Sequence, residues 1–224
     1  MKKKSTALYP HPFSSAYWKD AAAECKSIRS LSYAAFLCAV AIVVEKFNIP
    51  LTPALHVSVS FFAIALCSML TGPVLAVGCG LLVDLIGMMG SPYPFFPGYT
   101  LTAILTAVVY ALFLYRSKVT YLRVLLCEIL INFAINTFLG SLWRTVLYDG
   151  FFPAYVLTSG AKNLLLLLPE AFLLCLFLQA LHRPLIHLGA LPPQTEIRFR
   201  KRSFLVSLVV TIVGTCIAAL LYFL

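Results

Sequence analysis

Long apolar stretches, separated by short polar segments, run through this sequence and restrict it to a membrane environment. Hydrophobic residues make up 61% of the 224 residues and charged residues only 11%, whereas ordinary soluble domains are roughly a quarter charged. A bilayer core about 30 Å thick needs about 20 apolar residues per helix. We therefore expect an all-α integral membrane protein. Its spans are predicted at about residues 31–47, 53–70, 74–89, 99–115, 124–148, 154–181 and 204–224.

The segments between these stretches predict the domain organisation. A short helix is expected at residues 14–29, lying at the membrane interface with Tyr17 and Trp18 as its aromatic anchors. The predicted parts are an N-terminal segment at 1–29, a six-span membrane domain at 30–182, a basic linker at 183–203 and a seventh span at 204–224.

Lysine and arginine residues are concentrated in three segments outside the spans. The formal net charge is +9, and most of the positive charge lies in the N-terminal segment, in residues 116–123 and in residues 183–202. Cationic loops of membrane proteins stay on the cytoplasmic side. Nucleic-acid binding would instead require a basic domain with interleaved aromatic residues. We therefore expect a cytoplasmic N-terminus and, if the seventh span inserts, a C-terminus outside.

A short loop rich in proline and aromatic residues follows the third span, which carries Asp84. Its prolines restrict φ and remove backbone donors, and glycines on either side permit sharp turns. The topology places this loop on the outer face, where we expect it to form a stiff aromatic cap. The residues that form this cap are Tyr93, Phe95, Phe96, Pro97, Gly98, Tyr99 and Thr100.

Polar side chains recur inside the predicted fifth span, where such groups are costly and usually functional. They are spaced every four residues and therefore lie on one face of a helix. Trp143 is next to the outer end of this stripe. The stripe consists of Glu128, Asn132, Asn136, Gly140 and Arg144.

Further polar groups enter the sixth span, and two interpretations of the whole set remain open. In the first, Lys162 pairs with Asp84 or Glu170, and the asparagines join helices by hydrogen bonds. In the second, the groups line an outward-open pocket for a polar solute, over which the aromatic cap closes. Their common depth favours the pocket. The residues expected in the outer half of the membrane are Asp84, Asn136, Arg144, Lys162 and Asn163.

Motifs for catalysis, ATP binding and metal binding are absent from the sequence. It lacks Gly-x-x-x-x-Gly-Lys-[Ser/Thr], His-Glu-x-x-His and Gly-x-Ser-x-Gly. Its seven cysteines have no metal-type spacing, so we assign them no chemistry. A small enzyme that uses Asp84 and Glu170 as an acid/base pair is the less favoured alternative. We expect a solute-binding subunit of a larger transporter, with no enzyme activity, no catalytic residues, no cofactor and no metal.

Two alanines in the first span, Ala35 and Ala39, lie one turn apart on one helix face. Small residues at this spacing let another helix approach closely in lipid. The face is therefore suited either to packing within the chain or to docking of a partner protein.

A set of short motifs resembles the substrate-binding (S) subunits of energy-coupling factor (ECF) transporters, most closely the folate-family members. The motifs are spread over about residues 14–182. They are Tyr17-Trp18 up to Arg29, Ala35-x-x-x-Ala39, Gly72-Pro73, Asp84-x-x-Gly87, Phe96-Pro97-Gly98-Tyr99-Thr100, Asn136-Thr137 with Trp143, Lys162-Asn163 and Pro169-Glu170.

The resemblance implies a six-helix vitamin-binding subunit, to which residues 204–224 add an extra C-terminal transmembrane helix. Such a subunit associates with a membrane-embedded coupling (T) subunit and two cytoplasmic ATPases, and it topples in the membrane to present its substrate inside. The resemblance also implies that the face with Ala35 and Ala39 docks on the T subunit. In one departure from the family pattern, Gly160 stands where an arginine is expected shortly before Lys162.

Folate or a related pterin is the substrate that the resemblance implies, and another vitamin or a nucleobase-like solute is the alternative. A planar pterin would stack on Phe95, Phe96 or Trp143. Its anionic glutamate tail would meet Arg144 or Lys162. The residues predicted to bind substrate are Asp84, Tyr93, Phe95, Phe96, Pro97, Gly98, Tyr99, Thr100, Asn132, Asn136, Trp143, Arg144, Lys162 and Asn163.

Overall fold

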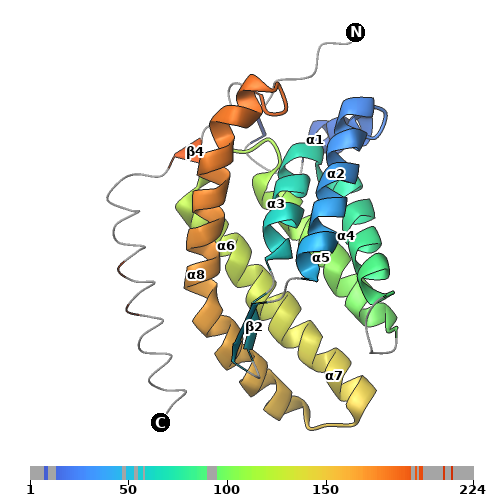
Figure 1. Ribbon diagram of the computed structural model, residues 1–224, viewed down its shortest axis with the longest axis vertical. Coiled ribbons are helices and arrows are strands. Elements are labelled where there is room, and N and C mark those ends of the chain that lie inside the picture. The colour runs from blue at the N-terminus through green and yellow to red at the C-terminus, as the bar shows by residue number, and fades with distance from the viewer. Residues whose placement is uncertain are drawn as a thin grey trace. The chain divides into compact units, whose positions relative to one another are not determined.

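The chain forms two compact units (Figure 1). The first consists of residues 1–118 and 182–196, and the second of residues 119–181 and 197–224. Tyr93 and all of the predicted seventh span except Val209 and Val213 lie outside the described residues. The computed structural model describes residues 8–9, 14–46, 49–52, 55–57, 59–89, 95–192, 195, 197–198, 209 and 213.

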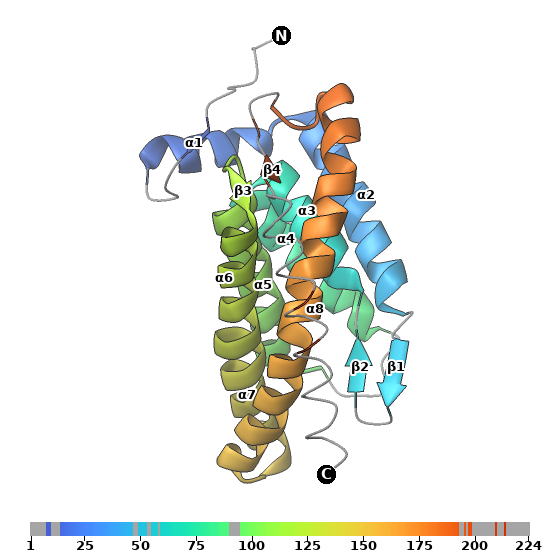
Figure 2. The ribbon, with the colours of Figure 1, turned by 90° about the vertical axis from the view of Figure 1, so that its left-hand side faces the viewer.

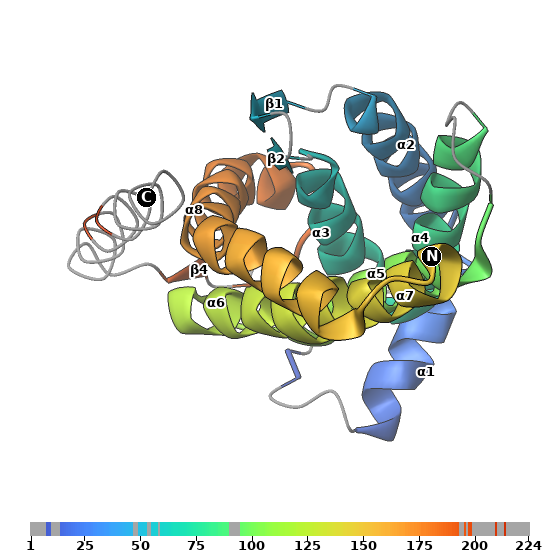
Figure 3. The same ribbon diagram turned by 90° about the horizontal axis from the view of Figure 1, so that it is seen from below.

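Helices and one short antiparallel β-hairpin make up the described part of the first unit. Helices α2, α3, α4 and α5 pack as a bundle, in which α3 and α4 each contact both α2 and α5 (Figure 3). Helix α1 runs across the ends of the bundle helices (Figure 2). The elements are α1 (Ser15–Glu24), α2 (Ile28–Glu45), β1 (Ile49–Thr52), β2 (Leu55–Val57), α3 (Ser60–Thr71), α4 (Pro73–Met88) and α5 (Pro97–Leu114).

Two long helical segments, joined by a short turn at Asp149, form most of the second unit. The first segment is helical throughout Tyr121–Tyr148, but its middle part is a π-helix, η1. The strands β3 and β4 pair in parallel. The last residues of α8, from His182 onward, group with the first unit. The elements are β3 (Val119–Thr120), α6 (Tyr121–Ile129), η1 (Leu130–Leu139), α7 (Gly140–Tyr148), α8 (Phe152–His187) and β4 (Ile197–Arg198).

The expected all-α membrane architecture is confirmed. Within the described residues, four helical segments are long and apolar enough to cross a bilayer: α2, α5, Tyr121–Tyr148 and α8. Two shorter apolar helices, α3 and α4, complete the set. At about 1.5 Å per residue, the 18 residues of α2 or of α5 extend about 27 Å, close to the thickness of a hydrocarbon core.

The predicted second span, 53–70, is wrong in its first part. Residues 49–52 and 55–57 form the β-hairpin, and the helix begins only at Ser60. The hairpin contains Ile49, Thr52 and Val57, and β-branched residues favour strands. Because a short apolar run has the same hydropathy in a strand and in a helix, the sequence pattern could not separate the two. Helix α3 is therefore only 12 residues long.

The sixth span also differs from its prediction, because α8 continues to His187 instead of ending near residue 181. The predicted basic linker, 183–203, therefore begins as helix. Pro184 does not end α8, and its carbonyl oxygen still accepts a hydrogen bond from the backbone N–H of Leu188. The predicted domain boundaries themselves stay predictions.

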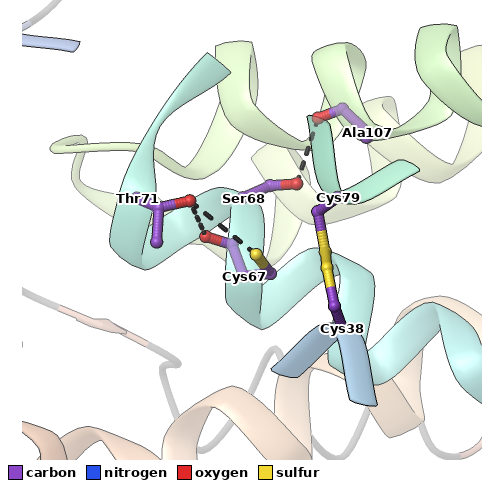
Figure 4. The surroundings of a disulfide bond; sticks show 6 residues. All are labelled: Cys38, Cys67, Ser68, Thr71, Cys79 and Ala107. Carbon is purple, nitrogen blue, oxygen red and sulfur yellow. Dashed lines mark hydrogen bonds between the residues drawn. A yellow bond between two sulfur atoms is a disulfide. The ribbon is translucent and has the colours of Figure 1, made fainter. Parts of the chain in front are cut away.

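Small side chains bring α2 and α4 into close contact. The Cα atoms of Cys38 and Cys79 are 5.7 Å apart, and a disulfide joins the two residues (Figure 4). The sequence assigns the cysteines no chemistry, because they show no metal-type spacing, and this disulfide between residues 41 apart is a difference from that expectation. Nearby, Ser68 of α3 donates a hydrogen bond to the carbonyl oxygen of Ala107 on α5 at 3.1 Å. The disulfide thus joins α2 to α4, and the hydrogen bond joins α3 to α5.

A glycine at the α3–α4 turn is required by its surroundings. Gly72 has a φ of +80°, and a Cβ at this position would lie 3.0 Å from Cζ of Tyr115. Tyr115 also packs edge to face on Tyr17 of α1, with ring centroids 5.4 Å apart. Burial raises the pKa of the Tyr115 phenol well above its usual range. The ring of Tyr115 thus fills the space between the turn and α1.

A buried ion network attaches α1 to Arg116, which lies two residues after the end of α5. Arg116 is 6% exposed, and its guanidinium donates to Asp20 Oδ2 at 2.5 Å and to Glu24 Oε1 at 2.9 Å. Tyr9 donates to Asp20 at 2.8 Å, and Ser30 of α2 donates to the other oxygen of Glu24. The sequence analysis counts Arg116 among the cations that determine topology, but its charge pairs with Asp20 and Glu24 inside the first unit. The network therefore determines how α1 and the start of α2 sit on the bundle.

Replacing Arg116 with alanine is expected to lower the free energy of unfolding by about 3 kcal/mol, because Glu24 and Asp20 would keep their charges without a cation. The thermal unfolding midpoint in detergent measures this loss. The triple variant Arg116→Met, Asp20→Leu, Glu24→Met should recover most of it, since no buried charge remains. If Arg116→Ala unfolded at the parent temperature, the network would not contribute to stability.

Candidate functional site

Asp84 of α4 lies against the first turn of α5. Thr100 Oγ1 donates a hydrogen bond to Asp84 Oδ2 at 2.6 Å. One turn away, α4 and α5 approach so closely that a Cβ on Gly80 would lie 2.9 Å from the carbonyl oxygen of Ala103. Helix N-termini favour negative charge, so this turn suits a carboxylate. Asp84 thus has a neutral partner on α5 that had not been considered for it.

The described part of the aromatic cap forms the start of α5. Phe96 is the N-cap residue with extended backbone, and Pro97 occupies the first helical position, where its missing N–H costs nothing. The rings of Phe96 and Tyr99 meet edge to face with centroids 5.9 Å apart. Phe95 is 55% exposed. The proline therefore starts the helix, and two aromatic side chains gather beside it.

A second carboxylate near Asp84 escaped the sequence analysis. Glu45, the last residue of α2, lies within electrostatic range of Asp84. Its Oε2 atom would be 2.9 Å from a Cβ on Gly87, and the neighbouring Lys46 donates to the Gly87 carbonyl oxygen at 2.9 Å. Both α2 and the third span were predicted to run outward. Counting residues from the inner end of each of these two helices would have placed Glu45 and Asp84 at a similar depth in the membrane.

In the second unit, a cluster of amide and hydroxyl groups joins η1 to α8. Asn163 Nδ2 donates to the backbone oxygen of Asn132 at 3.1 Å and to Thr137 Oγ1 at 2.9 Å. Thr137 itself donates to the same backbone oxygen at 2.8 Å, five residues back along the chain. Short π-helical segments occur frequently at functional sites. Here the segment turns a backbone carbonyl and Thr137 toward α8.

The predicted four-residue stripe breaks within this π-helix. Glu128 and Asn132 are buried, but Asn136 is exposed and Thr137 is buried in its place. A π-helix has more residues per turn than an α-helix, so the residue that faces inward after Asn132 is Thr137 instead of Asn136. The four-residue spacing expected for an α-helix could not predict this shift. Asn136 still donates to Asn132 Oδ1 at 3.3 Å, and Asn132 Nδ2 donates to Glu170 Oε2 at 3.0 Å.

Two cations lie close together in the second unit. Lys162 of α8 is within electrostatic range of both Arg144 of α7 and Glu170. Both cationic side chains are half-buried, as is Trp143 beside Arg144. Among the described residues, no carboxylate forms a salt bridge with Lys162. Two like charges held at one place are suited to bind an anion.

Gly160, which replaces the arginine of the family pattern, faces the same segment. A Cβ added at Gly160 would lie 3.6 Å from Cγ2 of Thr137. A side chain larger than alanine would therefore have to fit against η1. Position 160 thus supplies no cation, whereas Arg144 and Lys162 supply two elsewhere in the second unit.

The predicted substrate residues are distributed over both units. Asp84 and residues 95–100 belong to the first unit, and the predicted residues from Asn132 to Asn163 belong to the second. Tyr93 lies outside the described residues. That the two groups form one pocket stays a prediction.

The small-residue face of α2 is exposed in this chain. Ala35 and Ala39 are both exposed, whereas Ala34, Leu37, Cys38 and Ala41 are buried. Phe36 next to them is 68% exposed. Close packing within the first unit therefore uses the opposite face of α2, toward α3 and α4.

Comparisons with known proteins identify similar folate transporters. No sequence family model matches the chain. The chain is 35% identical over 123 residues to the folate transporter FolT of Clostridium novyi (strain NT), a match that covers 54% of this chain and 72% of that protein. It is 29% identical over 122 residues to FolT of Leuconostoc mesenteroides subsp. mesenteroides, covering 51% and 66%. The crystal structure of FolT bound with folic acid superposes with a TM-score of 0.57 at 28% identity, over 64% of this chain and 88% of that one.

Asn163→Leu is expected to lower the free energy of unfolding by about 1 kcal/mol, since interhelical hydrogen bonds in membranes contribute roughly 0.6 to 1.7 kcal/mol. Thermal unfolding without added ligand measures the change. Ser159→Ala is the matched control on the same helix, because the buried Ser159 hydroxyl has no hydrogen-bond partner in the described part of the chain. It should be neutral or stabilising. Equal effects of the two variants would contradict a role of Asn163 in joining the helices.

Proposed function

The chain belongs to the FolT family of folate transporters, and from this we propose that it is the folate-binding S subunit of an ECF uptake transporter. The observation that carries the proposal is the 35% identity over 72% of the Clostridium novyi protein. The likeness to a FolT structure bound with folic acid, at 28% identity, supports the same ligand. The subunit would bind folate from outside and deliver it through a T subunit and two ATPases, without catalysis of its own.

In the proposed site, each part of folate meets a matching group. The planar pterin stacks on Phe95, Phe96 or Trp143, because aromatic faces favour such packing. Residues from Tyr93 to Thr100 form the outward gate. Asp84 contributes to the donor and acceptor edge, since its Oδ2 already accepts from Thr100 and its other oxygen can accept from the ligand. Of the two predicted amides, Asn136 is the one proposed to bind the pterin, because its side chain is exposed, whereas Asn132 is buried and donates to Glu170.

The glutamate tail is proposed to bind at the two neighbouring cations. Arg144 and Lys162 lie within electrostatic range of each other, and folate carries two carboxylates at its tail. A hydrogen bond to a charged group contributes about 1.5 to 3 kcal/mol. Binding of the tail would also offset the mutual repulsion of the two cations. In this proposal, the glutamate tail is bound by charge attraction, whereas the pterin is bound by stacking on aromatic rings.

Arg144→Gln and Lys162→Gln are each expected to weaken folic acid binding at least about ten-fold, which corresponds to 1.4 kcal/mol. Their affinity for pteroic acid, which lacks the glutamate, should stay within about two-fold of the parent. Isothermal titration calorimetry measures both. Arg123→Gln, near the opposite end of the same helical segment, is the control. If both variants lost affinity equally for folic acid and for pteroic acid, the two cations would not bind the glutamate tail. If the parent bound no folic acid, mass spectrometry of the co-purifying solute would identify the actual vitamin.

The exposed face with Ala35 and Ala39 is proposed to dock on the T subunit, because small residues permit close helix contact. Ala35→Trp should abolish co-purification of the T subunit and the ATPases while leaving folate affinity unchanged. Leu164→Trp on α8, where the native side chain is 61% exposed, places the same bulk at another lipid-facing position and should leave the complex intact. A complex that survives Ala35→Trp would show that the docking face lies elsewhere.

The proposed orientation places the N-terminus, residues 116–123 and the basic segment after α8 in the cytoplasm. The concentration of lysine and arginine in these parts supports it. The aromatic gate then faces outward, as uptake requires. Residues 204–224 would form an additional span that places the C-terminus outside.

A further inference from the structure

The charges of α1 are sorted between its two faces. Tyr17, Ala21 and Glu24 are buried against the bundle, and Asp20 turns to the same side to pair with Arg116. The opposite side is exposed and carries one cation, Lys19, beside Ser15 and apolar side chains. Further exposed cations follow in the turn after α1 and in the first turn of α2. We call the exposed cationic and large apolar residues of α1, of this turn and of the first turn of α2 the α1 face, and it consists of Trp18, Lys19, Lys26, Ile28 and Arg29.

Among the described residues of the first unit, few acidic groups lie near the cations of the α1 face. Both carboxylates of α1 pair with Arg116, whose single positive charge leaves one net negative charge in the network. The other carboxylates in the described part of the first unit are Glu45 and its neighbour Asp84. Glu45 is the last residue of α2 and Arg29 is its second, so about 24 Å of helix separates them. This exceeds the Debye length of about 8 Å at physiological salt. The three cations of the α1 face therefore outnumber the one net negative charge of the Arg116 network, and the face presents a net positive potential.

The apolar members of the α1 face suit an interface with lipid. Trp18 is 46% exposed and Ile28 is 84% exposed, directly beside the cations. Tryptophan prefers the headgroup level of a membrane, and a helix with apolar and cationic residues side by side lies in the interfacial plane. Because α1 runs across the ends of the bundle helices (Figure 2), its long axis follows the membrane surface when the bundle spans the bilayer.

We propose that the α1 face binds the headgroups of anionic phospholipids. Lys19, Lys26 and Arg29 contact the phosphates, and Trp18 and Ile28 insert at the level of the glycerol backbone. Buried Arg116 makes this surface possible, because it removes both acidic side chains of α1 from the headgroup region. The proposal does not depend on the identity of the transported solute.

Trp18 provides a direct probe of this surface. The chain has two tryptophans, so a Trp143→Phe variant leaves Trp18 as its sole tryptophan fluorophore. This variant is reconstituted in phosphatidylcholine vesicles that contain either brominated phosphatidylglycerol or brominated phosphatidylcholine at equal mole fraction. We expect at least about two-fold stronger quenching by the anionic lipid, because each cation near an anionic surface contributes several-fold to its attraction. The preference should disappear in 1 M salt, where the Debye length is about 3 Å.

Two triple variants in the same background separate charge from fold. Lys19→Gln, Lys26→Gln, Arg29→Gln should lose the lipid preference, whereas the charge-conserving Lys19→Arg, Lys26→Arg, Arg29→Lys should keep it. Should the neutral variant not fold, the salt titration of the charged chain still decides. Equal quenching by both lipids, or a preference that survives in the neutral variant, would overturn the proposal. Quenching by neither lipid would also overturn it and would assign the α1 face to a protein partner.

Discussion

The seam between α4 and α5 depends on side chains small enough to let the two backbones touch. Ala76 and Ala107 are completely buried there, and Gly80 has no room for a Cβ against α5. Without a hydrophobic force between helices in lipid, such close packing is a main source of helix association. One turn beyond Gly80, the same antiparallel register brings Asp84 to Thr100. The position of the carboxylate, and of the aromatic residues that start α5, therefore follows from small residues that are not among the predicted substrate residues.

Hydropathy predicted most helices of this fold, because every backbone polar group within a bilayer must be satisfied inside its own segment. The predicted helix at 53–70 is wrong in its first part, because a short apolar run near the end of a span can form either a helix or a strand. Only the residues from Ser60 onward are helical. Arg116 shows a second limit. A lysine or arginine in a loop is counted as a topology signal. That Arg116 pairs with Asp20 and Glu24 instead can be seen only once α1 is packed on the bundle.

The candidate site was predicted by residue type better than by geometry. Asn132 and Asn163 were expected among the polar groups of the spans, and both are buried. Their partners were not foreseen, because the π-helix replaces Asn136 with Thr137 on the inward side and no spacing rule for an α-helix contains that change. Glu45 was not predicted for a different reason. It is the last residue of α2, and a charge at a helix end does not indicate a site unless its depth in the membrane is compared with that of charges on other helices.

The hydrogen bonds of the second unit separate groups that hold the fold from groups that remain for a ligand. The amide nitrogens of Asn132 and Asn163 already donate to protein acceptors. Breaking these bonds to reach a ligand would leave buried donors or acceptors unsatisfied, at a cost of about 1 to 3 kcal/mol each. Arg144 and Lys162 are half-buried, lie near each other, and gain the most from an arriving carboxylate. The amides are thus better suited to hold η1 on α8, and the selectivity for an anionic tail is expected to come from the two cations.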